Sequence, residues 1–213
     1  APCGAQRQEG RPVMEYALEL KNVTKRYPDF MLDSVDLALP RGCIMGFVGE
    51  NGAGKSTTIQ LILDLIRRDG GQIAVLGQDN QKGMEKIKHR LGVVLDESCF
   101  PESLNARDIQ AILKNIYRNW DAARFEGLCR RFALPEGKAV KDYSRGMKMK
   151  LSIAAALSHG AELLILDEAT SGLDPVVRDE ILDVFLEFIQ DERHSILVSS
   201  HIISDLEKIC DYI

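Results

Sequence analysis

The sequence predicts an α/β fold with a core of parallel strands, interrupted by an inserted helical subdomain at about residues 97–156. Short apolar runs typical of buried strands alternate with longer stretches of helical period. One such stretch, 103–157, is helical in pattern throughout and lies between two of those runs. With 45% hydrophobic residues the chain can bury one substantial core, so we expect one domain at residues 14–213, with core segments 14–96 and 157–213.

The predicted strands fall into two classes. ALELKNV (17–23) and SVDLAL (34–39) alternate between apolar and polar residues, as half-buried strands do. CIMGFV (43–48) is almost continuously apolar, which is typical of a strand buried on both faces. Three further runs are of this buried type: LGVVL (91–95), LLIL (163–166) and SILVS (195–199).

A helix is predicted directly after the first buried strand. In STTIQLILDLIRR (56–68), Ile59, Ile62, Leu63 and Ile66 share one helical face, and Gly70-Gly71 is expected to end the helix. The chain therefore predicts the order strand, glycine loop, helix.

Composition narrows the function classes. A net charge of −5 argues against a broad basic face, so we expect no nucleic-acid partner. No apolar run approaches the roughly 18 to 20 residues that a membrane-spanning helix needs, so any work at a membrane would require a partner.

The five cysteines are widely spaced without a CxxC pair, which favours free thiols in a reducing cytosol. Residues 1–13, APCGAQRQEGRPV, are expected to be an added leader or a disordered arm.

The glycine loop GENGAGKST fits the pattern GxxxxGK followed by Ser or Thr. In such a loop the glycines turn backbone N–H groups inward around a phosphate, and the helix that follows directs its positive end at the same place. Lys55 would reach the β- and γ-phosphates, and the Ser56 hydroxyl would be a magnesium ligand. The alternative is a turn that merely links strand to helix. The candidate nucleotide-binding residues are Gly49, Glu50, Asn51, Gly52, Ala53, Gly54, Lys55, Ser56 and Thr57.

An acidic pair follows the apolar strand in LLILDEATSGLD (163–174). Asp167 would hold magnesium at the C-terminal edge of the sheet, where α/β sheets bind ligands. Glu168 would then be the general base, or would position the water that attacks the γ-phosphate. Taken alone, an acidic pair at a strand end is often only a helix or turn cap.

His201 ends the apolar run SILVSSH. A single histidine after a strand is more often structural than catalytic. At the C-terminal edge of the sheet, however, it could donate to the γ-phosphate and hold the attacking water. His89, His159 and His194 have no such context and are expected to be surface or packing residues.

Four motifs, GENGAGKST, YSRGMKMKL, LLILDEATSGLD and SSH, resemble in order and separation those of the ATP-binding cassette (ABC) ATPases, over about residues 17–213. The resemblance implies a P-loop NTPase fold, in which a mixed sheet has a parallel RecA-like core, and ATP hydrolysis with Mg²⁺. Residues 144–147 correspond to the family's signature motif, Leu173-Asp174 to the loop after the acidic pair, and His201 to the switch histidine. Tyr27 looks like the aromatic residue that stacks on adenine, although it could equally be an ordinary strand-edge tyrosine.

The signature segment opens a predicted helix with Ser144, Arg145 and Gly146. Serine there needs no function, because it is a favoured helix cap. In ABC ATPases two cassettes face head to tail, and the signature helix of one directs its N-terminus at the γ-phosphate held by the other. The resemblance thus implies that these three residues form half of a nucleotide site completed in trans, in a homo- or heterodimer.

Two departures from the family pattern stand out. Asp96 lies where the family has a Gln that contacts magnesium and water, and we hypothesise that Asp96 is a metal-side ligand. The signature carries Arg145 where Gly is usual and Met147 where Gln is usual. The family also continues beyond the equivalent of Ile213, so we expect the domain to be truncated at its C-terminal end.

The resemblance implies an energy-coupling ATPase subunit, most like single-cassette subunits of drug or bacitracin-type exporters. It would lie on the cytoplasmic face of the cell membrane, bound to a separate membrane-spanning subunit. Phe100, Pro101 and Leu104 are candidate docking residues, although each alone is more simply a loop or helix-entry residue. The alternative is a soluble ABC-type ATPase acting on ribosomes, DNA or cofactor assembly. A nucleotide kinase would share the glycine loop but would leave the signature segment unexplained.

Overall fold

The computed structural model describes residues 15–50, 52–96 and 100–213. Its strands are β1 (Tyr16–Arg26), β2 (Met31–Pro40), β3 (Ile44–Val48), β4 (Gly70–Val75), β5 (Gln78–Asp79), β6 (Leu91–Val94), β7 (Leu163–Asp167) and β8 (Ser195–Ser200). Its α-helices are α1 (Lys55–Ile62), α2 (Asn80–Ile87), α3 (Ala106–Ile116), α4 (Ala122–Arg131), α5 (Arg145–Leu157), α6 (Pro175–Phe188) and α7 (Ile203–Leu206). Short 3₁₀ turns lie at Lys88–Arg90 and Val140–Asp142.

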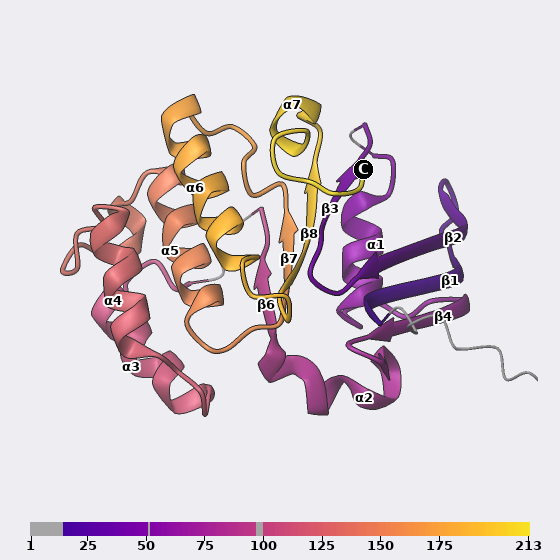
Figure 1. The fold of residues 1–213 in the computed structure, drawn as a ribbon, viewed down its shortest axis with the longest axis horizontal. Coiled ribbons are helices and arrows are strands. Elements are labelled where there is room, and N and C mark those ends of the chain that lie inside the picture. Colours follow the sequence, from indigo (N-terminus) through magenta and orange to yellow (C-terminus); the bar gives the residue numbers. More distant parts are fainter. Residues whose placement is uncertain (1–14, 51, 97–99) are drawn as a thin grey trace, which may run out of the picture.

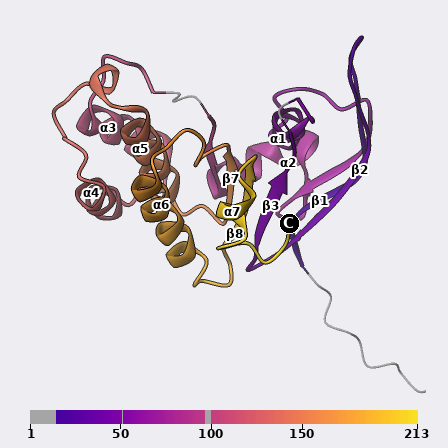
Figure 2. The same cartoon turned by 90° about the horizontal axis from the view of Figure 1, so that it is seen from above.

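The strands form two sheets. An antiparallel sheet has the order β2-β1-β4-β5, and a parallel sheet has the order β3-β8-β7-β6 (Figure 1). Helices α3 to α6 lie on one side of the parallel sheet, and α1 lies between the two sheets (Figures 1 and 2). Two apolar clusters fill these layers, one under the helices and one around α1. The α/β class and the parallel core are therefore confirmed.

The parallel sheet brings the ends of its strands to one edge. Every residue of β7 and β8 is buried, as their continuous apolar sequences predict. The two strands pair in register, so that Asp167 lies opposite Ser199. The loops after β3, β6, β7 and β8 all leave from this edge, because parallel strands point the same way.

The prediction that the first helix continues to Ile66 is wrong, because α1 ends at Ile62. Asp64 adopts a left-handed backbone with φ 55°, and its N–H bonds to the Leu61 carbonyl. The Leu65 N–H bonds to the Gln60 carbonyl at 2.9 Å, which completes a Schellman ending. The buried Asn80 amide also donates to the Leu61 carbonyl at 2.6 Å, so a tertiary contact helps to end the helix.

The glycine pair at residues 70–71 begins strand β4 instead of only ending a helix. A Cβ on Gly71 would lie 2.3 Å from the Asn22 carbonyl oxygen of β1, and Gly71 has φ 81°. Only glycine therefore allows β4 to approach β1 this closely. Strand β4 and the antiparallel sheet that it completes were not predicted from the sequence.

Between β6 and β7 the described residues form α3, α4 and α5, joined by turns. Asn105 and Asp108 make a reciprocal capping box at the start of α3, and Asp121 caps α4. Helix α5 packs on β6 as well as on α4. The segment expected to be helical throughout is thus three separate helices, and its assignment as a subdomain stays a prediction. Among the described residues, no helix is long and apolar enough to cross a membrane.

Candidate active site

The glycine loop joins the end of β3 to the start of α1. Gly52 and Gly54 have φ 86° and 96°, a left-handed backbone that favours glycine. A Cβ on Gly54 would lie 2.9 Å from the Phe30 ring, so the loop approaches this ring closely. Within the loop, the Ala53 N–H bonds to the Glu50 carbonyl at 3.1 Å. Asn51 lies outside the described residues.

The loop folds around the side chain of Lys55. The Lys55 side chain is 7% exposed, and its ammonium group donates to the carbonyls of Gly49 at 2.6 Å and Glu50 at 3.2 Å. Ser56 is exposed beside it in the first turn of α1, and Thr57 is half-buried. The Lys55 ammonium and the Ser56 hydroxyl therefore lie together at the N-terminus of α1. Such a site suits the binding of an anion that carries a metal ion.

Asp167 ends β7 in a buried position. The Ser199 hydroxyl donates to Asp167 Oδ1 at 2.5 Å from the neighbouring strand. The same hydroxyl accepts from the Glu168 N–H at 3.1 Å, so one serine orients both members of the acidic pair. Ser199 was not selected from the sequence, where it is one of several small residues in SILVSSH. Its signal was the pairing register, which the sequence does not display.

Glu168 has a left-handed backbone, with φ 52°. This conformation costs a non-glycine residue about 1–2 kcal/mol, and the two bonds from its N–H to the Ser199 carbonyl and hydroxyl help to hold it. The carboxylate lies 3.3 Å from the Lys55 ammonium and 2.7 Å from Nδ1 of His201. Lys55, Glu168 and His201 thus meet, although each follows a different strand.

Tyr27 lies at the end of β1, apart from this network, and is 43% exposed. Its ring centroid is 6.5 Å from that of Phe30, and the Lys25 ammonium lies 5.5 Å from its centroid. Phe30 in turn covers Gly54. An aromatic pair, exposed Tyr27 and half-buried Phe30, therefore lies beside the glycine loop, and Phe30 was not selected from the sequence.

Ser144 is the N-cap of α5, and its hydroxyl accepts from the Met147 N–H at 3.3 Å. Before it, Tyr143 is anchored by a 2.7 Å hydrogen bond to the Pro135 carbonyl, and burial raises the pKa of this phenol. A Cβ on Gly146 would lie 3.4 Å from Val177 and 3.8 Å from Leu173, so the first turn of α5 contacts the region that begins α6. Ser144 and Gly146 do not join the Lys55 network within the described chain.

Asp96 follows β6, where its carboxylate accepts a hydrogen bond from the Arg145 guanidinium at 2.6 Å. Both side chains are about half exposed. The structure thus pairs two of the three positions at which the sequence departs from the family pattern. The hypothesis that Asp96 contacts a metal stays a prediction.

Comparison with known proteins agrees with this geometry. The profile described as ABC transporter matches residues 32–171. The bacitracin transport ATP-binding protein BcrA of Enterococcus faecalis is 32% identical over 204 residues, which cover 94% of this chain and 66% of BcrA. The lantibiotic transport ATP-binding protein SrtF of Streptococcus pyogenes is 31% identical over 200 residues, covering 92% of this chain and 85% of SrtF.

A solved structure described as the ATP binding subunit of an ABC transporter superposes with a TM-score of 0.81 at 28% identity, covering 92% of this chain and 85% of that one. The chain spans only 66% of the length of BcrA, so a third of that relative has no counterpart in it. The family match itself includes the glycine loop, the first turn of α5 and the acidic pair. The chain therefore belongs to the ABC transporter family.

Proposed function

We propose that this chain binds and hydrolyses MgATP as the ATP-binding subunit of an ABC transporter. The observation that carries the proposal is the position of the Glu168 carboxylate, 3.3 Å from the Lys55 ammonium and 2.7 Å from the His201 ring. A carboxylate, a cation and an imidazole at the C-terminal edge of a parallel sheet can together activate water beside a phosphate.

In this proposal the loop of residues 49–57 holds the phosphates. Lys55 donates to their oxygens in place of the loop carbonyls that it now contacts. Ser56 and Asp167 hold Mg²⁺, a pairing of hydroxyl and carboxylate that suits this hard cation. Tyr27 stacks on the base. Bound Mg²⁺ supplies charge neutralisation to the phosphate oxygens.

Four residues of the chain each have a separate role in ATP hydrolysis under this proposal. Glu168 orients the attacking water and accepts its proton, because its carboxylate faces the centre of the site. His201 holds Glu168 through Nδ1, which leaves its other ring nitrogen for the γ-phosphate. Lys55 stabilises negative charge that develops on the phosphate oxygens. Ser199 keeps Asp167 and Glu168 in their relative orientation.

Of the signature residues, Ser144 and Gly146 would complete the nucleotide site of a second cassette, whereas the side chain of Arg145, selected with them from the sequence, pairs with Asp96. The Ser144 hydroxyl and the N-terminus of α5 would form one end of this anion site. Gly146 lets the first turn of α5 pack against Val177 of α6. We expect Glu168→Gln to trap an ATP-bound dimer, and Glu168→Gln with Ser144→Arg to remain monomeric. Size-exclusion chromatography with light scattering, with and without MgATP, measures this. A Glu168→Gln protein that binds ATP but never dimerises would contradict the trans site.

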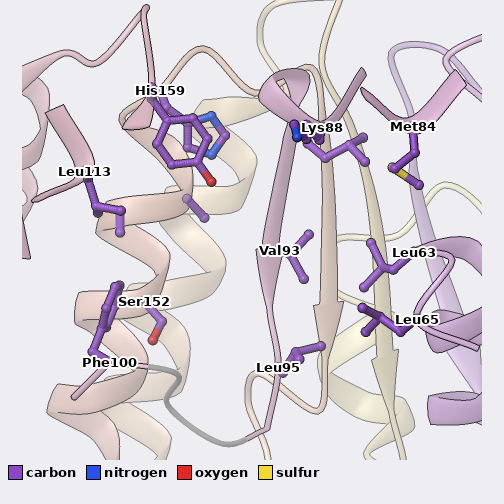
Figure 3. Close-up of a pocket in the computed structure, with 14 residues that line it drawn as sticks. Leu63, Leu65, Met84, Lys88, Val93, Leu95, Phe100, Leu113, Ser152 and His159 are labelled. Atoms are coloured by element: carbon purple, nitrogen blue, oxygen red, sulfur yellow. The ribbon is translucent and has the colours of Figure 1, made fainter. Parts of the chain in front are cut away.

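A separate membrane-spanning subunit would contact the groove between β6 and the helices. This apolar groove has a volume of about 420 Å³. Phe100, Leu113 and Ser152 lie on one side of it, and Leu63 and Leu65 lie on the other (Figure 3). Of the three predicted docking residues, Phe100 lines the groove, Pro101 is exposed, and Leu104 packs against the core.

The position on the cytoplasmic face of a membrane, through that subunit, is part of the same proposal. BcrA and SrtF are named for bacitracin and lantibiotic transport, which favours an export system for a peptide antibiotic as the assembly. The proposal is tested by purification of the tagged chain from detergent-solubilised membranes, with mass spectrometry of what co-elutes. A stoichiometric multi-spanning protein supports it. Recovery with ribosomes, or with no membrane protein, would favour the soluble ATPase instead.

A further inference from the structure

The first turn of α5 carries an unusual charge distribution. A helix N-terminus has a positive end, which acidic side chains stabilise and basic ones oppose. Arg145 is the first residue of α5 and Lys148 lies in the same turn, while this turn contains no acidic residue. The helix itself therefore supplies nothing to offset these two cations.

The compensating charges come from the segment that follows β6. Arg145 Nη2 lies 2.6 Å from Asp96 Oδ1, and Lys148 Nζ lies 3.7 Å from Glu102 Oε1. All four side chains line one cavity of about 480 Å³. Two carboxylates from one segment thus face two cations of one helical turn.

The Arg145 guanidinium also touches a third segment. A Cβ on Gly172 would lie 2.9 Å from Arg145 Nη1 and 3.3 Å from its Cζ, so the guanidinium lies directly against this glycine. Gly172 has φ 66° and precedes Leu173, whose side chain lies near Gly146. Arg145 therefore contacts both the end of β6 and the loop after the acidic pair.

We propose that Arg145 and Asp96 act as a charge pair that positions the first turn of α5 against the loop at residues 170–174. Arg145 is a positioning residue in this arrangement, and Asp96 holds it away from the place where Ser144 and Gly146 would meet a phosphate. The functional part of this inference rests on the proposed trans site, whereas the positioning part does not.

The test compares Asp96→Arg with the double variant Asp96→Arg/Arg145→Asp, which restores the pair with its charges exchanged. Asp96→Arg places a third cation at the helix N-terminus. Amide hydrogen exchange should become roughly fivefold faster or more at Met147, Lys148 and Ser171, whose N–H groups bond to Ser144 or to Glu168. The double variant should return exchange to within about twofold of the unmodified chain. The measurement is made without nucleotide, so it does not depend on ATPase activity.

A matched control exists elsewhere in the molecule. Arg107 lies in the first turn of α3 and pairs with Glu136 at 2.7 Å, far along the chain from the glycine loop and the acidic pair. Glu136→Arg removes an exposed pair at a helix N-terminus in the same way. Exchange at Met147, Lys148 and Ser171 should stay within about twofold in this variant.

ATP turnover separates positioning from direct contact. Asp96→Arg should lower kcat roughly fivefold or more, with KM for ATP within about twofold, and the double variant should recover kcat.

Unchanged exchange in Asp96→Arg, or exchange that the second substitution does not restore, overturns the proposed charge pair. Restored exchange without restored kcat shows that Arg145 or Asp96 acts directly at the nucleotide or its metal, which overturns their assignment as a positioning pair. If the unmodified chain shows no turnover, the proposed function fails, while the exchange data still decide on the pair.

Discussion

The Ser199 hydroxyl lies 2.5 Å from the Asp167 carboxylate, on the adjacent parallel strand, and both side chains are buried. Since the same hydroxyl accepts from the Glu168 N–H, Ser199 is the residue through which β8 fixes the acidic pair of β7. Asp167 and Glu168 therefore depend on a side chain that follows them by about thirty residues.

Ser199→Ala should lower the free energy of unfolding by about 1–3 kcal/mol, because it leaves the buried Asp167 carboxylate without this donor, although the Glu168 N–H keeps its bond to the carbonyl of residue 199. It should also lower kcat more than it raises KM for ATP, since the orientation of Glu168 changes. Urea denaturation and steady-state kinetics measure the two effects. Ser158→Ala is the matched control, because the buried Ser158 hydroxyl bonds to the Ala154 carbonyl of its own helix. Equal kinetics in both variants would show that Ser199 has no role in the site.

Arg178 and Asp205 form an ion pair between α6 and α7, in which the Asp205 carboxylate is buried and the Arg178 side chain is 20% exposed. The Arg178 guanidinium also donates to the Leu173 carbonyl at 3.0 Å, and Asp205 is only 2% exposed. Asp205→Ala should lower the free energy of unfolding by about 3 kcal/mol, because it leaves the Arg178 guanidinium, which is 20% exposed, without its carboxylate partner. Lys208→Ala removes the neighbouring exposed pair with Asp179 and should cost less than about 1 kcal/mol. Thermal and urea unfolding of the two variants tests this contrast, and similar losses would refute the dependence on burial.

Asn80 is 1% exposed and donates to the Leu61 and Ile62 carbonyls at the end of α1. Asn80→Leu should lower the free energy of unfolding by about 2 kcal/mol, because buried carbonyls lose their donor. The control is Asn115→Ala, in which an exposed asparagine loses a bond to its own helix. That control should change stability by less than about 0.5 kcal/mol. Loss of the Asn80 amide without a stability change would mean that the Schellman ending is sufficient alone.

Glu162 should make stability dependent on pH. The Arg90 guanidinium first, and then that of Arg41, hold the pKa of Glu162 below its ordinary value of 4.5. Since the pKa of Glu162 is lower in the folded chain than in the unfolded chain, the unfolded chain binds more protons at pH values between these two pKa values. The contribution is therefore fully present above about pH 4.5 and is lost as pH falls through the folded pKa.

Glu162→Gln should accordingly be less stable than the unmodified chain at neutral pH, and the difference should narrow as pH falls below 4.5. Urea titrations over this range measure it. Arg90→Gln should show a similar narrowing, because it removes the first partner of the same carboxylate. A difference that stays constant with pH would contradict this linkage.

The core strands were predictable because each is a contiguous segment. LLIL and SILVS are apolar along their whole length, and burial on both faces needs nothing beyond such a run. The end of α1 was not predictable in this way. Its apolar period continues to Ile66, but Asn80 and the left-handed Asp64 end the helix earlier.

The candidate site shows the same division. Lys55 follows from the spacing of one glycine loop, and Glu168 from one strand end, so both could be selected from the sequence. Ser199 and Phe30 could not, because serine and phenylalanine occur at many positions and only packing distinguishes these two. The pairing of Asp96 with Arg145 could not be predicted from the sequence either, because it depends on how α5 packs beside the end of β6.

The sequence by itself determined the buried strands, the loop that precedes α1 and the acidic end of β7, since local spacing and hydrophobic pattern encode each of them. Only the tertiary structure decided which side chains meet. Asp167 and Ser199 are 32 residues apart in the chain, and Asp96 and Arg145 are 49 apart. Contacts at such separations depend on strand order, register and helix packing. These are set by the burial and hydrogen bonding of the whole chain, which no single segment contains.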